Sequence, residues 1–250
     1  MTRLIRAELV KLRTTRTAPI LLAAMAAYAV VTVVFNVTTA GAQGNPPLDA
    51  GILPLLLASP SRLTSGTVLL LGILMMAGEF RHQTITQTFL VIPRRGRVVA
   101  AKLAAGALAG LVFAATTTAV VLAVGLPWLW LKGVPIRVSG AVGRELAGVL
   151  AAAALSGLLG VAVATLVRNQ VAAVTGALLW FLLVEGVLPP LLRAPDLPKW
   201  LPGGATGALT YPGPAGEAFL PMWAGGLLLA GYAVLLAAIG SRVTVRRDVG

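Results

Sequence analysis

The sequence predicts an all-α, polytopic membrane protein, and three observations carry this prediction. The chain of 250 residues is 58% hydrophobic and 11% charged, whereas ordinary globular chains are about 25% charged. Six long, almost uncharged stretches run through it, and a helix needs roughly 20 apolar residues to cross a bilayer. Basic residues gather mainly in every second gap between these stretches. The expected spans are 18–39, 63–78, 103–126, 146–167, 171–188 and 222–241.

The gaps between the spans leave no room for a separate soluble domain. Six such stretches are not expected in a soluble protein, because its helices must show a polar face to water. We therefore expect a single transmembrane domain over residues 1–250. The absence of cysteine excludes disulfides, thiol catalysis and cysteine metal sites.

The net charge of +12 is explained by membrane topology. With the N-terminus inside, the inside segments hold 14 of the 20 Lys and Arg residues and the outside segments hold the other 6, as the positive-inside rule requires. No nucleic-acid-binding motif accompanies the charge, so nucleic acid is not an expected partner. Arg outnumbers Lys by 16 to 4, which favours a bacterial source. The expectation is a multi-pass protein of the bacterial cell membrane with both termini cytoplasmic.

The segment before the first span is predicted to form a short amphipathic helix over 3–16. Ile5, Leu9 and Leu12 recur on one face at helical spacing. Such a helix can lie in the headgroup layer with its cations near anionic lipid; the alternative is a merely basic flank that orients the span. The apolar run that follows is longer than the roughly 7–15 residues of a signal peptide, so we expect an uncleaved first span.

The gap between the second and third spans is the most informative loop. Pro93 stops any helix before it, and residues 94–97 are predicted to form a basic turn. Residues 79–92 are then predicted to form a short cytoplasmic helix that carries both polar and aromatic side chains. Such a helix suits a groove on another protein, whereas the alternative is an ordinary amphipathic connector on the membrane surface.

This gap carries a resemblance to a known family. It resembles the first cytoplasmic loop of ABC exporter permeases of the type 2 class, through Glu79-Phe80-Arg81, Thr84, Leu90, Pro93, Arg94-Arg95 and Lys102. The start of the chain is similar to the start of those proteins, through Glu8, Lys11 and Thr15-Arg16. The specific part of the resemblance covers residues 3–16 and 79–102, and elsewhere the similarity is one of topology.

The resemblance implies a permease subunit that forms half of a translocation path. The loop would be a coupling helix that fits a cleft in a separate ATPase subunit, and the working unit would hold two ATPases and two permeases, identical or paralogous. The chain has no phosphate-binding loop, so it is not expected to be an enzyme itself. The implied coupling residues are Glu79, Phe80, Arg81, Thr84, Thr88, Phe89 and Pro93.

A different class of function stays open. The chain would then be a non-ABC secondary transporter, or a membrane scaffold subunit of an enzyme complex. A secondary transporter typically shows several intramembrane charges and inverted repeats, whereas the sequence shows one clear charge and no convincing repeat.

That intramembrane charge is Glu185, in the fifth span. A charge at the centre of the hydrocarbon costs roughly 2.5–3.5 kcal/mol, so Glu185 is expected to face protein or a cavity; the alternative is that it reaches the headgroups at the outer interface.

Arg144 and Glu145 are expected to form a local interfacial pair. His82 is the only histidine and lacks a second ligand nearby, so no metal, cofactor or catalytic residue is predicted.

Two apolar gaps are predicted to enter the outer leaflet without crossing it. Residues 189–221 hold eight of the sixteen prolines, and irregular backbone at membrane depth is tolerated where protein buries it. Residues 51–58 are predicted to form a smaller segment of the same kind.

Gly106 and Gly110, four residues apart, are expected to let two helices approach closely.

Overall fold

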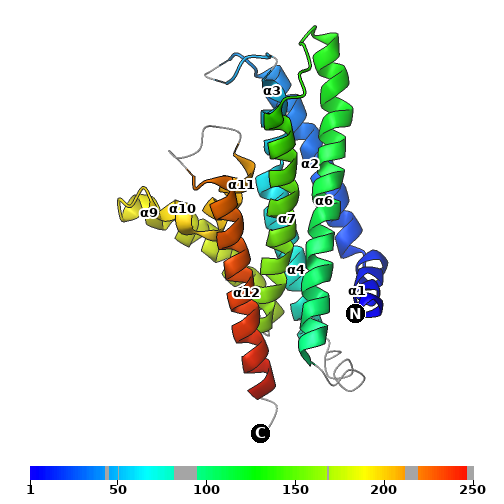
Figure 1. Cartoon of the computed structure of the whole chain (residues 1–250), viewed down its shortest axis with the longest axis vertical. Coiled ribbons are helices and arrows are strands. Elements are labelled where there is room, and N and C mark those ends of the chain that lie inside the picture. The colour runs from blue at the N-terminus through cyan, green and yellow to red at the C-terminus, as the bar shows by residue number, and fades with distance from the viewer. Residues whose placement is uncertain (43–44, 50, 82–94, 168, 212–218, 247–250) are drawn as a thin grey trace.

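The structure, a computed structural model, is a bundle of helices (Figure 1). It describes residues 1–42, 45–49, 51–81, 95–167, 169–211 and 219–246. No strand occurs in these ranges, and six helical segments are long and apolar enough to cross a membrane. The prediction of an all-α, polytopic membrane protein is confirmed.

The helices follow one another from the N-terminus. They are α1 (Thr2–Thr14), α2 (Thr17–Thr38), α3 (Ile52–Ala58), α4 (Ser61–Arg81), α6 (Arg95–Leu131), α7 (Gly140–Leu166), α8 (Gln170–Leu179), η1 (Trp180–Val187), α9 (Leu188–Leu191), α10 (Leu197–Trp200), α11 (Pro202–Thr210) and α12 (Met222–Arg246).

Helix α7 lies at the centre of the bundle and contacts α4, α6, α11 and α12. Helix α2 packs on the outer side of α6, and the continuous segment α8–η1–α9 leans away from the bundle (Figure 1). That segment is the least buried of the six spans. The start of α1 and the end of α12 lie at the same end of the molecule (Figure 1), which we call the basic end.

Helix α6 is much longer than the span expected at 103–126. It begins at Arg95, so the basic turn expected at 94–97 is wrong for its described part, and it continues through Pro127 to Leu131. Its 37 residues give a length of about 56 Å, nearly twice the roughly 30 Å of a hydrocarbon core. A helix of this length extends beyond the hydrocarbon, and its first turn carries the exposed Arg97.

Helix α4 also passes its expected end. Glu79, Phe80 and Arg81 form its last turn, so a separate helix does not begin at residue 79. The rest of the predicted coupling helix, 82–92, lies outside the described residues. The boundary moved because the charge of Glu79 is compensated inside the bundle, as described below, and does not force the helix to end.

The expected break before the last span is present. Short helices α10 and α11 occupy the Pro-rich gap, and α3 occupies the smaller segment near residue 51. Span five runs on past its expected end at 188 and continues through Pro189 and Pro190 to Leu191. The depth of these helices in a bilayer stays a prediction.

Small residues bring α4, α6 and α7 together. A Cβ on Gly106 would lie 2.8 Å from the carbonyl oxygen of Gly157 on α7, and one on Gly110 would collide with the backbone of Ala153. Gly72 on α4 faces the same stretch of α7. The predicted role of Gly106 and Gly110 in close packing is confirmed, and α4 and α6 both pack closely on α7.

This packing predicts that Gly106→Ala lowers stability. The added methyl group has no room against Gly157, and overpacking of this kind costs about 1–3 kcal/mol. Gly66→Ala in α4 is the control, because a Cβ there meets nothing within 4 Å, and removing a helical glycine stabilises by up to about 1 kcal/mol. Thermal unfolding of the purified protein measures both changes, and equal effects would contradict the packing argument.

Candidate functional site

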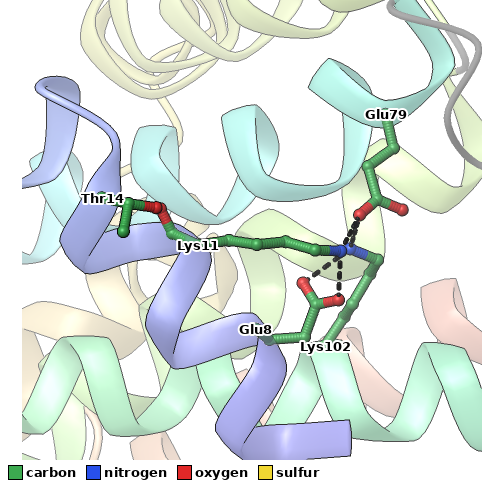
Figure 2. Close-up of polar contacts among 5 residues, drawn as sticks. All are labelled: Glu8, Lys11, Thr14, Glu79 and Lys102. Carbon is green, nitrogen blue, oxygen red and sulfur yellow. Dashed lines mark hydrogen bonds and ion pairs between the residues drawn. The ribbon is translucent and has the colours of Figure 1, made fainter.

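Four charged side chains from three helices meet beside the basic end of the bundle (Figure 2). Glu8 and Lys11 come from α1, Glu79 from the last turn of α4, and Lys102 from the second turn of α6. We call these four residues the ion cluster. It joins segments that lie up to 94 positions apart in the chain.

Each lysine of the ion cluster bridges both carboxylates. The Nζ atom of Lys102 lies 2.7 Å from Oε2 of Glu8 and 2.7 Å from Oε1 of Glu79. The Nζ atom of Lys11 lies 2.9 Å from Oε1 of Glu8 and 2.7 Å from the same Oε1 of Glu79. Two positive and two negative charges therefore cancel within one compact group.

Burial makes this balance necessary. The side chain of Lys102 is 0% exposed, and those of Glu8 and Glu79 are 10% exposed. Buried charges are tolerated only with well-placed partners of opposite sign. Lys11 is half exposed and lies at the solvent side of the cluster. Burial alone would lower the pKa of Lys11, but its hydrogen bonds to Glu79 and Glu8 and their charges outweigh this, so its pKa is raised.

Of the four residues, Glu79 depends most on its partners for compensation of its charge. It lies in the last turn of α4, where the helix dipole disfavours a carboxylate. Its Oε2 atom is buried and has no hydrogen-bond partner among the described residues, so both lysines hold it through Oε1 alone. Loss of either lysine would leave this carboxylate under-compensated.

Helix α1 is positioned by its amphipathic pattern. The predicted apolar face, with Ile5, Leu9 and Leu12, is turned toward the protein, and Leu12 packs against the apolar cluster that includes Met25 and Phe113. The helix is present as predicted, but its apolar face covers α6 and neighbouring helices. Glu8 lies on this same face, which is why an acidic side chain is carried into the bundle.

The structure places only part of the predicted coupling residues. Glu79 belongs to the ion cluster, Phe80 packs against the apolar core around α4 and α7, and Arg81 is exposed. The other predicted coupling residues lie outside the described part of the chain: Thr84, Thr88, Phe89 and Pro93. Their role stays a prediction.

Sequence reasoning missed the ion cluster as a unit. Glu8, Lys11 and Lys102 stood out only as charges in gaps or as parts of a resemblance. One signal was available: Glu8 shares a face with Ile5, Leu9 and Leu12, and an acid on an apolar face requires a cationic partner when that face is buried. The spacing of three residues indicates Lys11 as one partner, but the sequence alone contained no sign that Lys102 would be the other.

Glu185 makes a second polar contact between distant segments. Its Oε1 accepts hydrogen bonds from Nε1 of Trp180 and from the backbone N–H of Gly203, each 3.0 Å long. In the π-helical stretch η1, backbone bonds join residues five apart, which aligns Trp180 with Glu185. Gly203 stands in the first turn of α11, where N–H groups lack helical partners and a carboxylate is favourable. Glu185 thus ties span five to α11.

The expected pair of Arg144 and Glu145 does not form a direct ion pair, although the charge of Arg144 still acts on Glu145. Both lie inside α7, which begins at Gly140, and they point to different environments: Arg144 is exposed and Glu145 is 3% exposed. Within the described ranges no ion pair joins them, and Oε1 of Glu145 has no hydrogen-bond partner. Neighbouring residues on a helix do not share a face, which explains the separation.

The described residues contain no group of three or more His, Cys, Asp or Glu side chains that could hold a metal ion. Compared with known protein families and with curated proteins, the chain matches no family model and no curated sequence. The fold and the six apolar helices define the class: this is a multi-pass, α-helical membrane protein.

The ion cluster predicts that Lys102→Met strongly destabilises the protein. Removing one partner from a buried ion pair costs about 3–5 kcal/mol, because the remaining charge is left uncompensated. Lys199→Met is the matched control: its ion pair with the largely exposed Asp196 is worth at most about 1 kcal/mol. Thermal unfolding measures both. Adding Glu8→Gln to Lys102→Met should cost less than the sum of the single changes, and strict additivity would contradict the coupling.

The Glu185 contact predicts an interaction between two substitutions. A Cβ on Gly203 would collide with the Glu185 carboxylate, so Gly203→Ala should displace the start of α11 and speed amide hydrogen exchange over residues 203–210. Glu185→Ala opens space, so Gly203→Ala should add little in that background. Gly176→Ala, where a Cβ meets nothing within 4 Å, should leave exchange in α11 unchanged. Equal effects of Gly203→Ala in both backgrounds would rule out the contact.

Proposed function

We propose that the chain is the membrane-spanning permease subunit of an ATP-driven exporter of the type 2 ABC class, working in a bacterial cell membrane with both termini in the cytoplasm. Two copies, or one copy and a paralogue, would form the translocation path, and a separate ATPase subunit would bind and hydrolyse ATP. The proposal rests on the resemblance of segments 3–16 and 79–102 to that family. The six-span architecture supports it.

The observation that carries the proposal is the place of the ion cluster. Segment 82–94, where the coupling contact is expected, connects the end of α4 to the start of α6. Glu79 in the last turn of α4 and Lys102 in the second turn of α6 are both bound to α1 through Glu8 and Lys11. A displacement of segment 82–94 would therefore move three helices together.

The rest of the bundle would carry that movement onward. Helices α4 and α6 pack closely on α7 through glycine contacts, and close-packed helices shift as bodies more readily than they deform. At the opposite end, α11 contacts α7 and α12 and is tied to span five by Glu185. This arrangement supports a route from segment 82–94 to the predicted outer-leaflet segment.

One observation favours the alternative of a secondary transporter. Glu145 is buried in α7, and its Oε1 atom has no hydrogen-bond partner in the part of the chain that the structure describes. Buried acids inside spans are typical of proton or ion pathways. In that case Glu145 would be the coupling residue, and transport would follow an ion gradient without ATP.

Reconstitution with an ATPase encoded beside this chain tests the proposal. Wild-type protein should co-purify with the ATPase and stimulate ATP hydrolysis. Phe89→Ala should weaken the complex roughly thirtyfold, as expected when an interfacial aromatic anchor worth about 2 kcal/mol is removed. Glu79→Gln should retain the ATPase but lose transport, because the link between α4 and the two lysines is weakened. Arg137→Gln, an exposed change in the connection between α6 and α7, is the control.

Two outcomes would contradict the proposal. If ATPase stimulation and transport survive replacement of the whole of 82–92 by an unrelated linker, the coupling role is lost. Transport that needs a pH gradient, ignores ATP and is abolished by Glu145→Gln would establish the secondary transporter instead.

A further inference from the structure

Helix α1 has two faces with different roles. One face carries Glu8 and the apolar residues into the bundle. The other carries Arg3, Arg6 and Arg13, which are all exposed, with Val10 between them at 51% exposure. Positions 3, 6, 10 and 13 are spaced by three or four residues, so they follow one line along the helix. The fold uses the first face and leaves the second uncovered.

The exposed arginines have no acidic partner within the described ranges of the protein. No ion pair there involves Arg3, Arg6 or Arg13. The one acid on α1 is Glu8, and it is engaged by Lys11 and Lys102. Three like charges on one face repel one another, so an external anion would stabilise them.

The position of α1 indicates where that anion lies. Only Thr15 and Arg16 separate α1 from α2, and Ile20 in the first turn of α2 is 63% exposed, so the apolar surface that meets lipid begins directly beyond α1. Figure 2 shows α1 running across α4 and α6 rather than alongside them. A helix that crosses the spans in this way lies roughly along the membrane surface, at the depth of the headgroups.

We propose that the arginine face of α1 binds the anionic headgroups of phospholipids in the leaflet at the basic end of the molecule. The guanidinium group is suited to phosphate because it donates two parallel hydrogen bonds. Each basic residue near an anionic membrane surface contributes roughly a fivefold preference, so three arginines contribute about a hundredfold. This inference does not depend on the proposed exporter function.

Lipid binding would act on the ion cluster through the same helix. Because α1 supplies both Glu8 and Lys11, anionic lipid on its outer face holds these two side chains against Glu79 and Lys102. The lipid and the ion cluster thus stabilise the same docked position of α1 from opposite sides. Loss of the lipid should loosen α1 before it affects α7.

Native mass spectrometry of the protein released from nanodiscs tests this binding. The discs contain phosphatidylglycerol and phosphatidylcholine in equal amounts. Wild-type protein should retain phosphatidylglycerol preferentially. Arg3→Gln, Arg6→Gln and Arg13→Gln combined should weaken this preference about a hundredfold, whereas the corresponding triple change to Lys should keep most of it. The matched control combines Lys132→Gln, Arg137→Gln and Arg144→Gln, three exposed cations at the opposite end, and should keep the preference.

Several results would overturn the proposal. Wild-type protein could retain the two lipids equally, or the triple Gln variant could keep the preference unchanged. Displacement of the lipid by excess inorganic phosphate would identify a soluble anion as the ligand. Protection of the arginines only when an ATPase is added would assign the face to a protein partner.

Preparing the discs in about 1 M salt, where the Debye length falls to about 3 Å, should abolish the preference if it is electrostatic.

Discussion

Compensation of charge in a water-poor environment is the constraint on which the basic end of this protein depends. Lys102 is fully buried and Glu79 lies at the unfavourable end of a helix dipole, so neither is tolerable alone. Glu8 and Lys11 complete the balance, and they can do so only if α1 docks across α4 and α6. One neutral group of four charges therefore joins α1 to the last turn of α4 and to α6.

The bundle divides into a closely packed core and a loosely attached periphery. Glycines on α4, α6 and α7 let the backbones approach until no side chain separates them, which gives a core held by dispersion and by the exclusion of voids. The segment α8–η1–α9 has little such packing. A hydrogen bond from the start of α11 to Glu185 joins this segment to the bundle. Movement is easier where packing is sparse, so this periphery is the part best suited to change position relative to the core.

Helix α1 links three environments. Its buried acid and its half-exposed lysine enter the ion cluster, its apolar residues cover neighbouring helices, and its arginines face outward. A short helix is marginal by itself, so its stability must come from these contacts. Anything that changes the charge around α1, whether lipid or a protein partner, acts directly on the group that joins α4 to α6.

The sequence by itself determined the class of fold, because runs of apolar residues long enough for a bilayer leave no other solution than helices that satisfy their own backbone. It also determined the amphipathic α1, the short helices before the last span and the small-residue contacts of Gly106 and Gly110. It did not determine that Glu8, Lys11, Glu79 and Lys102 meet, that Arg144 and Glu145 separate, or that Glu185 binds Gly203. These pairings join residues far apart in the chain or depend on how a helix is rotated, and only packing of the whole bundle sets those distances. The boundaries of α4 and α6 differ from those predicted for the same reason, since a charge ends a span only when no partner compensates it.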